Sequence, residues 1–424
     1  MRIAAHTLGC KLNFAETSHL LRQFSAKGHS IVDFHSEADL YIINTCTVTA
    51  IAERKCRNAI RQAVRQNPNA QVAVIGCFAQ NERSQIEKIP GVTIILGNDE
   101  KHLLVELVTG HRSQVTGHRS QVTQNWDFAP AWSSNDRTRA FVKIQDGCDY
   151  FCSYCAIPIA RGRSRSATIE EVAAMANECA KTGAKEIVLT GVNTGTFGLH
   201  TGEHLIDLLR RLDSIEAIKR YRISSIEPNL ITDEIIDFTA QSRAFLPHFH
   251  IPLQAGSDNV LRLMHRHYDT ALYRKRIEYI KQRMPDACIA ADIIAGFNGE
   301  SEEDFKETKL FVESLPLSYL HVFTYSERPH TAALNLTPRT DMHLRRQRSQ
   351  ELHTISERKH AAFVASQMAK TRPVLWESDN HEGCMHGLTD NYIRVRREYD
   401  PSLTNKITEE TLTKQNIISG APTE

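Results

Sequence analysis

The sequence predicts an α/β protein in three parts: an N-terminal α/β domain on a parallel sheet, a central (β/α)6 partial barrel and a small C-terminal all-β barrel. Apolar, strand-like stretches alternate with helix-like stretches over most of the chain, which is typical of parallel sheets covered by helices. After residue 370 only short strands with turns between them follow. We therefore expect domains at residues 1–123, 138–370 and 371–424, with a linker at 124–137.

Length and composition restrict the class of protein. A chain of 424 residues is long enough for two or three domains with large cores. Lysine and arginine number 51 against 50 acidic residues, so any surface that attracts nucleic acid or membranes must be local. The first residues lack an apolar signal core and no stretch approaches 18 consecutive apolar residues, which predicts a cytoplasmic protein. In a reducing compartment its ten cysteines are metal ligands or buried thiols rather than disulfides.

Three strand-like stretches of the N-terminal third each end at a cysteine. The strands are expected at residues 3–10, 40–46 and 72–77, and helices at 16–27, 52–66 and 80–89. Because the carboxyl ends of parallel strands meet at one edge of a sheet, Cys10, Cys46 and Cys77 are expected to converge on one site. The alternative is three buried thiols, since free cysteine also packs as a small hydrophobe. The cysteines without this context are not expected to be ligands: Cys56, Cys179, Cys288 and Cys384.

Residues 109–122 repeat the run Thr-Gly-His-Arg-Ser-Gln-Val twice in direct succession. Each unit has little apolar content, so the period of seven does not predict a coiled coil. The repeat predicts a duplication in a tolerant surface loop, and the polar, proline-containing stretch after it predicts the interdomain linker.

A strand at residues 138–145 leads into a loop that carries Cys148, Cys152 and Cys155 in a C-x3-C-x2-C array. Thiolates at this spacing can bind three irons of a four-iron cluster, which leaves one iron open for a small molecule that takes an electron. The alternatives are a structural zinc site, which usually has four ligands from paired C-x2-C knuckles, and a disulfide, which does not suit the compartment. The array resembles the signature of the radical S-adenosylmethionine (SAM) superfamily, in which SAM binds the open iron.

Five further strands follow with helices between them, which completes six strand–helix units. They are expected at residues 186–191, 221–228, 249–254, 288–297 and 319–325. In a parallel barrel the active site lies at the carboxyl ends of the strands. The radical SAM resemblance therefore implies SAM contacts from residues at these ends and in the loop, namely Tyr154, Gly191, Glu227, Gln254 and Gly296. Strand alternation explains His248 and His250 better than a metal site does.

The motifs together resemble the methylthiotransferases, a family of radical SAM enzymes that insert a methylthio group. Besides the cysteine loop, the resemblance is carried by Thr7-Leu8-Gly9-Cys10-Lys11-Leu12-Asn13 and Asn44-Thr45-Cys46-Thr47-Val48-Thr49. It implies two [4Fe-4S] clusters, the second on Cys10, Cys46 and Cys77. One SAM would give its methyl group to sulfur at that cluster, and another the radical that removes hydrogen from the substrate carbon. It also implies an electron donor such as flavodoxin or ferredoxin, and neither a membrane nor DNA as partner.

Local motifs separate the branches of this family, which differ in substrate. The runs around Cys10 and Cys46 are similar to the branch that modifies C2 of N6-threonylcarbamoyladenosine-37, in the anticodon stem-loop of tRNA. The isopentenyladenosine branch usually has Asp-Ser-Glu where this chain has Glu16-Thr17-Ser18, and the ribosomal-protein aspartate branch has Pro-Lys-Asn where it has Lys11-Leu12-Asn13. Those two branches are the alternatives. A non-catalytic, RNA-binding iron–sulfur redox sensor is a remote alternative, because a sensor does not need an open iron.

The C-terminal strands are expected at residues 374–378, 384–388 and 392–398. Gly387 to Val395 resembles the core of TRAM, a small RNA-binding β-barrel at the end of methylthiotransferases. The resemblance implies that Tyr392 stacks on a base and that Arg394 and Arg396 bind phosphates.

Arg161 and Arg163 lie just past the cysteine loop. Guanidinium groups there are expected to bind RNA phosphate or a substrate carboxylate by paired hydrogen bonds. A solvated surface is the alternative.

Overall fold

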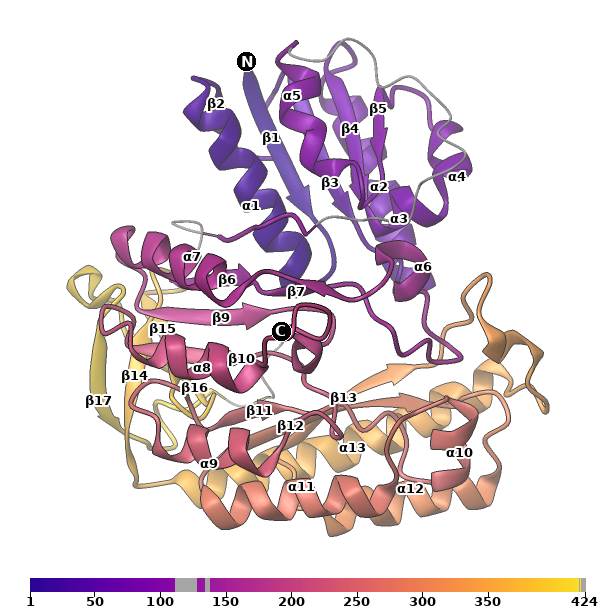
Figure 1. Cartoon of the computed structure of the whole chain (residues 1–424), viewed down its shortest axis with the longest axis vertical. Helices are drawn as coiled ribbons and strands as arrows, with labels where there is room; N and C mark the ends of the chain where they lie inside the picture. Colours follow the sequence, from indigo (N-terminus) through magenta and orange to yellow (C-terminus); the bar gives the residue numbers. More distant parts are fainter. Residues whose placement is uncertain (111–127, 134–137, 419, 421–424) are drawn as a thin grey trace.

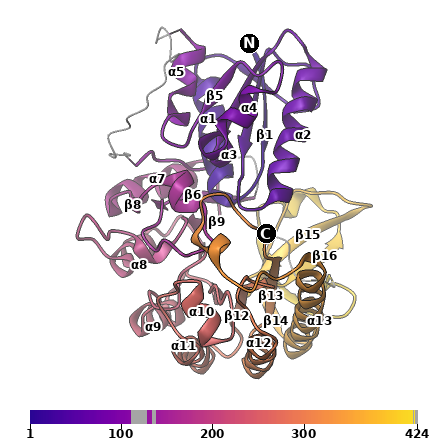
Figure 2. The same ribbon diagram turned by 90° about the vertical axis from the view of Figure 1, so that its right-hand side faces the viewer.

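A computed structural model of the chain describes residues 1–110, 128–133, 138–418 and 420. From residue 111 on, the tandem repeat lies outside the described residues. In Figure 1 the N-terminal domain stands above a central set of parallel strands, and Figure 2 shows the C-terminal sheet (yellow) to one side of these strands. This arrangement confirms the α/β class and the order of the three parts.

The N-terminal domain is a five-stranded parallel sheet in the order β2-β1-β3-β4-β5. Its strands are β1 (Arg2–Thr7), β2 (Ser30–Val32), β3 (Leu40–Thr45), β4 (Gln71–Gly76) and β5 (Ile94–Leu96). Its helices are α1 (Lys11–Ala26), α2 (Ala50–Gln66), α3 (Cys77–Asn81), α4 (Arg83–Glu87), the 3-10 helix η1 (Lys101–Leu103) and α5 (Leu104–Val108). Ile43 of β3 packs with α2 and Ile42 packs with α1 and α5, so both faces of the sheet are covered and the central strand β3 is buried along its whole length. The helix expected at residues 80–89 is instead two short helices, of which the first begins at Cys77 itself.

The central domain contains the six expected parallel strands. They are β6 (Arg139–Lys143), β9 (Glu186–Thr190), β10 (Arg220–Ile223), β11 (His248–His250), β12 (Cys288–Ala295) and β13 (Tyr319–Thr324). They form two three-stranded sheets, which meet where β10 and β11 lie side by side. A bridge between Tyr221 and Phe245 and a hydrogen bond from Ile226 N to His250 O (3.1 Å) join the two sheets there. The result is a partial barrel, with β6 and β13 at its two edges among the described residues.

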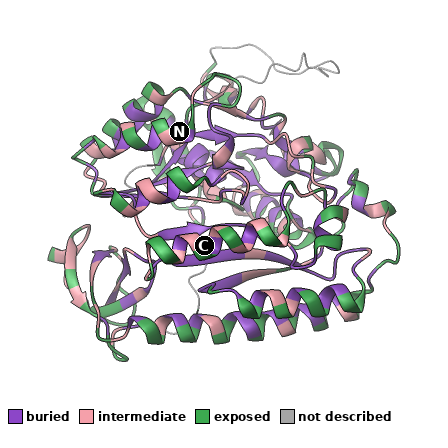
Figure 3. Ribbon diagram, turned by 60° about the horizontal axis from the view of Figure 1, so that its bottom comes forward, coloured by how far each residue is buried: buried purple, intermediate pink, exposed green. Residues whose placement is uncertain are grey.

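Helices cover the outer side of the partial barrel. The helices of this domain are α6 (Ile157–Arg161), α7 (Ile169–Lys181), η2 (Thr194–Thr196), α8 (Leu205–Asp213), α9 (Asp233–Gln241), α10 (Asp258–Leu263), α11 (Thr270–Arg283), α12 (Glu302–Ser314), η3 (Ala332–Asn335) and α13 (Met342–Gln367), of which α6 lies beside α3 of the N-terminal domain. Thr168 and Ser301 start α7 and α12 with capping boxes, in which a side chain and the backbone satisfy each other at the helix N-terminus. Figure 3 shows the helices with exposed outer faces, while the strands behind them are buried.

The C-terminal domain is an antiparallel sheet in the order β16-β15-β14-β17. Its elements are β14 (Thr371–Trp376), β15 (Cys384–Thr389), β16 (Arg394–Glu398), η4 (Pro401–Leu403) and β17 (Ile407–Thr411). A bridge between Val395 and Ile417 adds the last described segment to the edge of β16, so the sheet curls towards a small barrel.

The C-terminal sheet covers the end of the partial barrel at which the strands begin. Arg220 and Arg222 at β10 donate hydrogen bonds of 2.7–3.1 Å to backbone carbonyls of that sheet. Glu186, itself fully buried, accepts a 2.7 Å hydrogen bond from Arg222. Tyr392 stacks on His248, with ring centroids 4.2 Å apart. The carboxyl ends of the barrel strands lie at the opposite end, where the candidate site is found.

Among the described residues, no helix has the length and apolar character that crossing a membrane requires. Each sheet of the described residues falls inside one of the three expected domain ranges. The boundaries between the domains stay a prediction, because residues 111–127 and 134–137 are not described.

Candidate metal centres

The loop site consists of Cys148, Cys152 and Cys155, which lie between β7 (Gln145–Asp146) and α6. The strand β7 pairs with β8 (Arg165–Ser166), so the two ends of the loop are held together. Within the loop, the Cys148 N–H donates to Gly162 O (3.0 Å) and the Cys155 N–H to Cys152 O (3.0 Å). These bonds hold three thiols on one tight turn at the carboxyl end of β6, as the sequence predicts.

Arg266 organises the loop site, and the sequence pattern gave no signal for it. Its Nη1 donates to Cys152 Sγ (3.1 Å) and to the Tyr154 hydroxyl (3.3 Å), and its Nη2 forms an ion pair with Glu227. A second donor, the Ile157 N–H, lies 3.4 Å from Cys155 Sγ. N–H donors stabilise negative charge on sulfur and tune the reduction potential of iron–sulfur clusters.

Burial makes the thiols of the loop site weak acids. It raises the pKa of Cys148 to about 11 and the pKa of Cys155 to about 12. Both thiols therefore stay protonated until a cation takes the place of the proton, and metal binding at this site releases protons.

The convergent site consists of Cys10, Cys46 and Cys77, each at the carboxyl end of a different parallel strand. Cys10 is the N-cap of α1 after β1, Cys46 follows β3, and Cys77 opens α3 directly after β4. Burial raises the pKa of Cys46 to about 12, and the neighbouring thiols of Cys77 and Cys10 add to the shift. A Cβ on Gly9, whose φ is +100°, would lie 2.8 Å from Cys46 Cβ, so the ends of β1 and β3 meet at the thiols. The structure therefore brings the three cysteines to one edge of the sheet, and their role as cluster ligands stays a prediction.

Two asparagines support the convergent site: Asn13, which belongs to the motif around Cys10, and Asn98, for which the sequence gave no signal. Asn98 donates to Cys77 Sγ (3.4 Å) and to Ala160 O on α6 (2.7 Å), so it links this site to the helix behind the loop site. Asn13 donates to Leu8 O (2.9 Å) and Thr45 O (3.0 Å), the carbonyls just before the two cysteine turns.

The sequence left Cys56 out of the site, yet it touches it. Its Sγ accepts a 3.3 Å hydrogen bond from the Cys46 N–H. Cys56 lies on α2 and is fully buried. This contact does not test whether Cys56 binds a metal, so its expected role as a non-ligand stays a prediction.

An ionic network of five side chains lies between the two sites. Glu16 and Lys101 come from the N-terminal domain, and Lys143, Asp146 and Arg161 come from the partial barrel. Glu16 contacts Lys143 at 2.9 Å, Arg161 at 3.2 Å and Lys101, while Asp146 contacts Lys143 at 2.7 Å and Arg161 at 2.9 Å. None of the five side chains is more than 6% exposed. The network fixes the N-terminal domain against the cysteine loop.

The charges in this network hold one another ionised. Burial alone would raise the pKa of Glu16 and Asp146, but the neighbouring cations hold both well below their ordinary values. Arg161 is the strongest of these cations for Glu16, and Lys143 for Asp146.

A second interdomain contact flanks the convergent site. Arg328, after β13, pairs with Glu53 in the first turn of α2, and both side chains are buried. Glu53 also accepts a 2.7 Å hydrogen bond from the hydroxyl of Thr47, the residue after Cys46. Ion pairs therefore connect the domains on two sides of the convergent cysteines.

The structure separates the expected SAM contacts into two groups. Tyr154 and Glu227 lie beside the loop cysteines, as described above. Gly191 lies at the end of β9, where a Cβ would be 2.8 Å from Gln145 Oε1, and Gln254 (φ +64°) bridges to Ile293 of β12. Their contact with SAM stays a prediction.

Gly296 lies at the end of β12, and its expected contact with SAM stays a prediction. Its φ is +73°, and a Cβ there would lie 2.6–2.8 Å from Arg345 of α13. Both the positive φ and the close packing of α13 favour glycine at this position.

The expected RNA contacts need two corrections. Arg161 is 1% exposed and paired inside the ionic network, so its guanidinium does not reach a phosphate. Tyr392 is 4% exposed and stacked on His248, so its ring cannot stack on a base in this structure. Both were misread because sequence position does not show burial. Arg163, with 76% of its side chain exposed, and Arg394 and Arg396 at the surface keep the expected role as a prediction.

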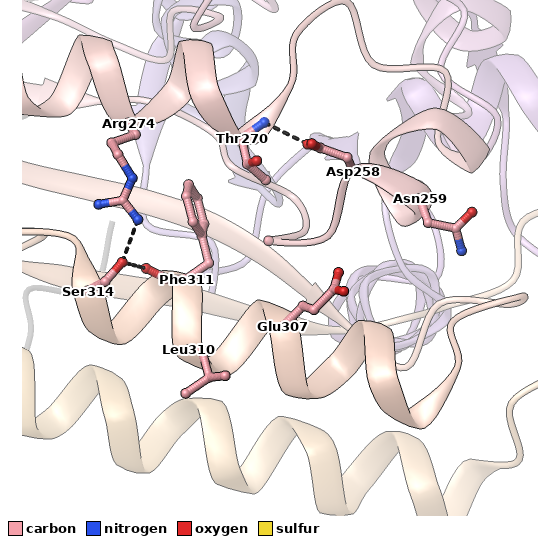
Figure 4. A pocket seen from close by; sticks show the side chains of 9 residues that line it. Asp258, Asn259, Thr270, Arg274, Glu307, Leu310, Phe311 and Ser314 are labelled. Atoms are coloured by element: carbon pink, nitrogen blue, oxygen red, sulfur yellow. Dashed lines mark hydrogen bonds between the residues drawn. The ribbon is translucent and has the colours of Figure 1, made fainter.

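A surface hollow of about 650 Å³ lies on the outer side of the barrel, between α10, α11 and α12 (Figure 4). Arg274, Glu307 and Phe311 are among the residues that line it, and Arg274 donates to Ser314 (2.7 Å) across one end. Neither set of cysteines is among its lining residues.

Each site supplies three thiols together with N–H donors to sulfur and nearby cations. That is the donor set of a four-iron cluster, and its negative charge is balanced by the arginines and lysines around it. The residues therefore fit two [4Fe-4S] clusters, each with one iron left without a cysteine from its own site.

Comparison with known proteins gives two family matches. Residues 2–97 match an uncharacterized protein family, UPF0004, and residues 142–312 match the radical SAM superfamily. The relative in Bacillus subtilis (strain 168), named threonylcarbamoyladenosine tRNA methylthiotransferase MtaB, is 38% identical, with 93% of this chain and 89% of the relative covered. The protein of the same name in Aquifex aeolicus (strain VF5) is 36% identical, with 94% and 97% covered. A tRNA-2-methylthio-N(6)-dimethylallyladenosine synthase of Wolinella succinogenes is 32% identical, with 96% and 95% covered.

Solved structures resemble the chain in fold. The radical SAM methyltransferase TsrM from Kitasatospora setae, with cobalamin and a [4Fe-4S] cluster bound, superposes with a TM-score of 0.57 at 15% identity, over 78% of this chain and 76% of that one. The cobalamin-dependent radical SAM enzyme OxsB gives 0.52 at 11% identity, over 85% and 56%. At these identities the likeness concerns the fold alone.

Proposed function

The chain belongs to the radical SAM methylthiotransferase family, and from this premise we propose that it inserts a methylthio group at C2 of N6-threonylcarbamoyladenosine-37 in tRNA. The main observation behind the proposal is the pair of three-thiol sites. A buried ionic network joins the two domains that hold them. Insertion of sulfur at a carbon needs both a site that activates the carbon and a site that offers the sulfur. The names of the first two relatives described above support the choice of base.

Each set of cysteines has its own task in this proposal. Cys148, Cys152 and Cys155 hold the cluster whose open iron takes SAM, and the cysteines of the convergent site hold the second cluster. When bound, these groups supply one-electron reduction, hydrogen abstraction and the methylated sulfur. The chain itself positions them, excludes water and balances their charge.

Arg266 and Glu227 form the protein side of the SAM position. Arg266 bonds to Cys152 Sγ and pairs with Glu227, so the carboxylate is held beside the cysteines. Only 12% of the Glu227 side chain and 3% of that of Arg266 are exposed. A carboxylate held in this way can accept hydrogen bonds from ribose hydroxyls or from the amino group of SAM.

We place the proposed reaction in the cytoplasm, with the anticodon stem-loop of tRNA as substrate and a donor such as flavodoxin or ferredoxin as the electron source. Arg163 at the loop site and Arg394 and Arg396 on the C-terminal sheet are the proposed phosphate contacts. Neither a membrane nor DNA has a role in the proposal.

The isopentenyl alternative has weaker support, because the relative with that activity is less similar to this chain than the first two relatives are. The ribosomal-protein alternative and the redox sensor find no support among the three relatives described.

The test is nucleoside mass spectrometry of total tRNA from a strain without this gene. We expect the methylthio derivative of threonylcarbamoyladenosine to disappear and its unmodified parent to accumulate, and the wild-type gene, but not Cys152→Ala, to restore it. Loss of the methylthio isopentenyl derivative would leave the reaction intact and change the substrate. An unchanged set of tRNA nucleosides would refute the proposal.

A further inference from the structure

The exposed face of α2 carries only positive charge, and we call its four cations the basic stripe: Arg54, Lys55, Arg61 and Arg65. On a helix, positions 54, 58, 61 and 65 fall within about 60° of one another, and position 55 lies beside them. From Arg54 to Arg65 the basic stripe runs for about 16 Å along the helix. The one acid of α2, Glu53, lies on the buried side and pairs with Arg328.

The cations of the basic stripe lack acidic partners. No carboxylate in the part of the chain that the structure describes forms an ion pair with any of the four. Exposed cations on the barrel helices differ in this respect. Arg210 of α8 pairs with Glu234 at 2.6 Å, and Arg358 of α13 pairs with Glu313 at 2.6 Å. Neighbouring acids neutralise those cations, whereas the charge of the basic stripe is free to attract an anion from outside.

One end of the basic stripe lies at the convergent site. Cys56, whose Sγ accepts the 3.3 Å hydrogen bond from the Cys46 N–H, follows Arg54 by two residues on the same helix. The first turn of α2 also rests on the barrel, since Ser326 Oγ accepts a 3.2 Å hydrogen bond from its backbone. A polyanion that follows the basic stripe from Arg65 is therefore led towards the convergent cysteines.

Two exposed apolar side chains lie between the convergent site and the basic stripe. Val48 is 51% exposed and Ile51 is 59% exposed. Ile51 lies on the same side of α2 as Arg54, three residues before it. The surface thus offers cations and then apolar side chains on the way to the cysteines, which suits a nucleic acid with charged phosphates and flat bases better than it suits a free phosphate ion.

The charge balance of the rest of the chain gives the basic stripe its weight. From residue 371 to the end, nine acids stand against six lysines and arginines, so the C-terminal domain has no surplus of positive charge. Phosphate contacts supply much of the affinity of proteins for nucleic acids, and α2 has five basic residues against one acid. Figure 2 shows α2 upright in the N-terminal domain, on the same side of the view as the C-terminal sheet (yellow).

We propose that the basic stripe binds the phosphate backbone of the substrate tRNA and directs its anticodon loop to the convergent site. The inference rests on the proposed function, and it gives the N-terminal domain an RNA contact of its own. Three of the four cations are arginines, whose planar group of N–H donors binds two phosphate oxygens at once. Contacts of this kind give affinity and orientation without reading the bases.

The test measures binding of an anticodon stem-loop RNA with threonylcarbamoyladenosine at position 37 to the full-length, cluster-loaded protein. Fluorescence anisotropy at several salt concentrations gives the affinity and the slope of log K against log salt. We expect Arg54→Gln/Arg61→Gln/Arg65→Gln to bind about 10- to 100-fold more weakly, with a slope shallower by about 2–3. Arg61→Gln alone should make the slope shallower by about 1. Glutamine keeps the helix propensity of these exposed positions, and circular dichroism verifies the fold.

The matched control is Arg210→Gln/Arg211→Gln/Arg358→Gln, which removes the same amount of positive charge from exposed cations that acids already neutralise. It should keep the affinity and the slope of the wild type. Equal losses in both triple variants would overturn the inference, because net charge alone would then explain the effect. Wild-type affinity and slope in the variant of the basic stripe would overturn it as well.

An acidic electron donor is the other partner that a basic surface could attract. The rate at which reduced flavodoxin reduces the clusters, followed by absorbance, separates the two partners. A variant of the basic stripe that binds RNA as the wild type does but is reduced more slowly would overturn the inference, since α2 would then be the docking site of the donor.

Failure of the inference differs from failure of the proposed function. If the wild type binds and modifies the RNA and the variant of the basic stripe does so equally well, the function stands and the RNA follows another surface. If the wild type neither binds nor modifies the stem-loop, the proposed function is wrong, and the basic stripe has no tRNA to bind.

Discussion

In the loop site one short segment supplies all three cysteines, whereas in the convergent site each cysteine comes from a different strand end. The loop site is held by hydrogen bonds within its own turn and by Arg266. The convergent site is held by the sheet beneath it and by charges that cross from the barrel, such as Arg161 and Arg328. The first site is therefore a local structure, and the second depends on the packing of two domains.

This difference predicts how far the effect of a substitution extends from each site. A change at the loop site should stop its own chemistry and leave the fold intact. A change in the ionic network should loosen the domain contact and reach both sites. Variants at each site and in the ionic network distinguish a local effect from an effect on both sites.

Cys152→Ala should abolish both SAM cleavage and product, because it removes one of three ligands from the cluster that takes SAM. The readouts are 5′-deoxyadenosine by liquid chromatography and the modified nucleoside by mass spectrometry. Cys384→Ala, which changes a cysteine of β15 outside both sites, is the control and should keep both activities. Normal deoxyadenosine formation by Cys152→Ala would remove the loop site from the reaction.

Cys46→Ala should retain measurable SAM cleavage and lose the methylthio product, since only the convergent site is damaged. The same two assays on one sample separate the sites directly. Product formation at the wild-type rate would show that the convergent cysteines are structural thiols and not cluster ligands.

Arg161→Met should destabilise the protein by about 3–5 kcal/mol, because it removes a buried cation that pairs with both Glu16 and Asp146. The midpoint of urea unfolding, followed by circular dichroism, measures the loss. Arg163→Met is a control only two residues away, and its mostly exposed side chain should change the stability by about 0.5 kcal/mol or less. Equal midpoints for both variants would mean that the network does not hold the domains together.

Arg266→Met should slow SAM cleavage by about 10- to 100-fold, the range for loss of a residue that supports a metal ligand. The variant loses the N–H donor to Cys152 Sγ and leaves Glu227 without its partner. A redox titration followed by electron paramagnetic resonance should also show a lower cluster potential. Asn98→Ala is its counterpart at the convergent site and should lower product formation with little effect on SAM cleavage.

Acid should weaken the contact between the domains. The pKa of Glu16 and that of Asp146 lie below their ordinary values of 4.5 and 3.8 in the folded chain. A depressed folded-state pKa means that the stabilisation is complete above the unfolded pKa and is lost as the pH falls below about 4.5. The urea midpoint of the wild type should drop in that range. A midpoint that is constant between pH 5 and pH 3 would contradict the role given to these carboxylates.

The sequence alone was enough to predict the fold and where in it both sets of cysteines lie, whereas their role as ligands stays a prediction. Strand–helix alternation indicated the parallel sheets, and the three strand ends indicated the convergence of Cys10, Cys46 and Cys77. The first signal depends on local periodicity. The second depends on the fact that the carboxyl ends of parallel strands meet at one edge of a sheet.

The supporting residues could not be predicted in the same way. Arg266 is more than a hundred residues from Cys152, and Asn98 is far from both Cys77 and α6 in sequence, so only the folded chain brings them together. Arg161 and Tyr392 were assigned to RNA because their types suit it, but burial decides what a side chain can touch. His250 was explained by strand alternation, and its cross-strand neighbours become visible only with the register.

The C-terminal sheet follows the barrel in the chain, so it leaves the ribosome after the barrel strands do. Until it emerges, Arg220, Arg222 and Glu186 face water at an open end, and His248 lacks the ring of Tyr392 against it. The barrel is thus completed only after its own last strand has been translated, whereas the N-terminal sheet has all its strands by residue 96. A premature stop codon in the final domain would consequently yield a barrel in which these side chains are left at an open end.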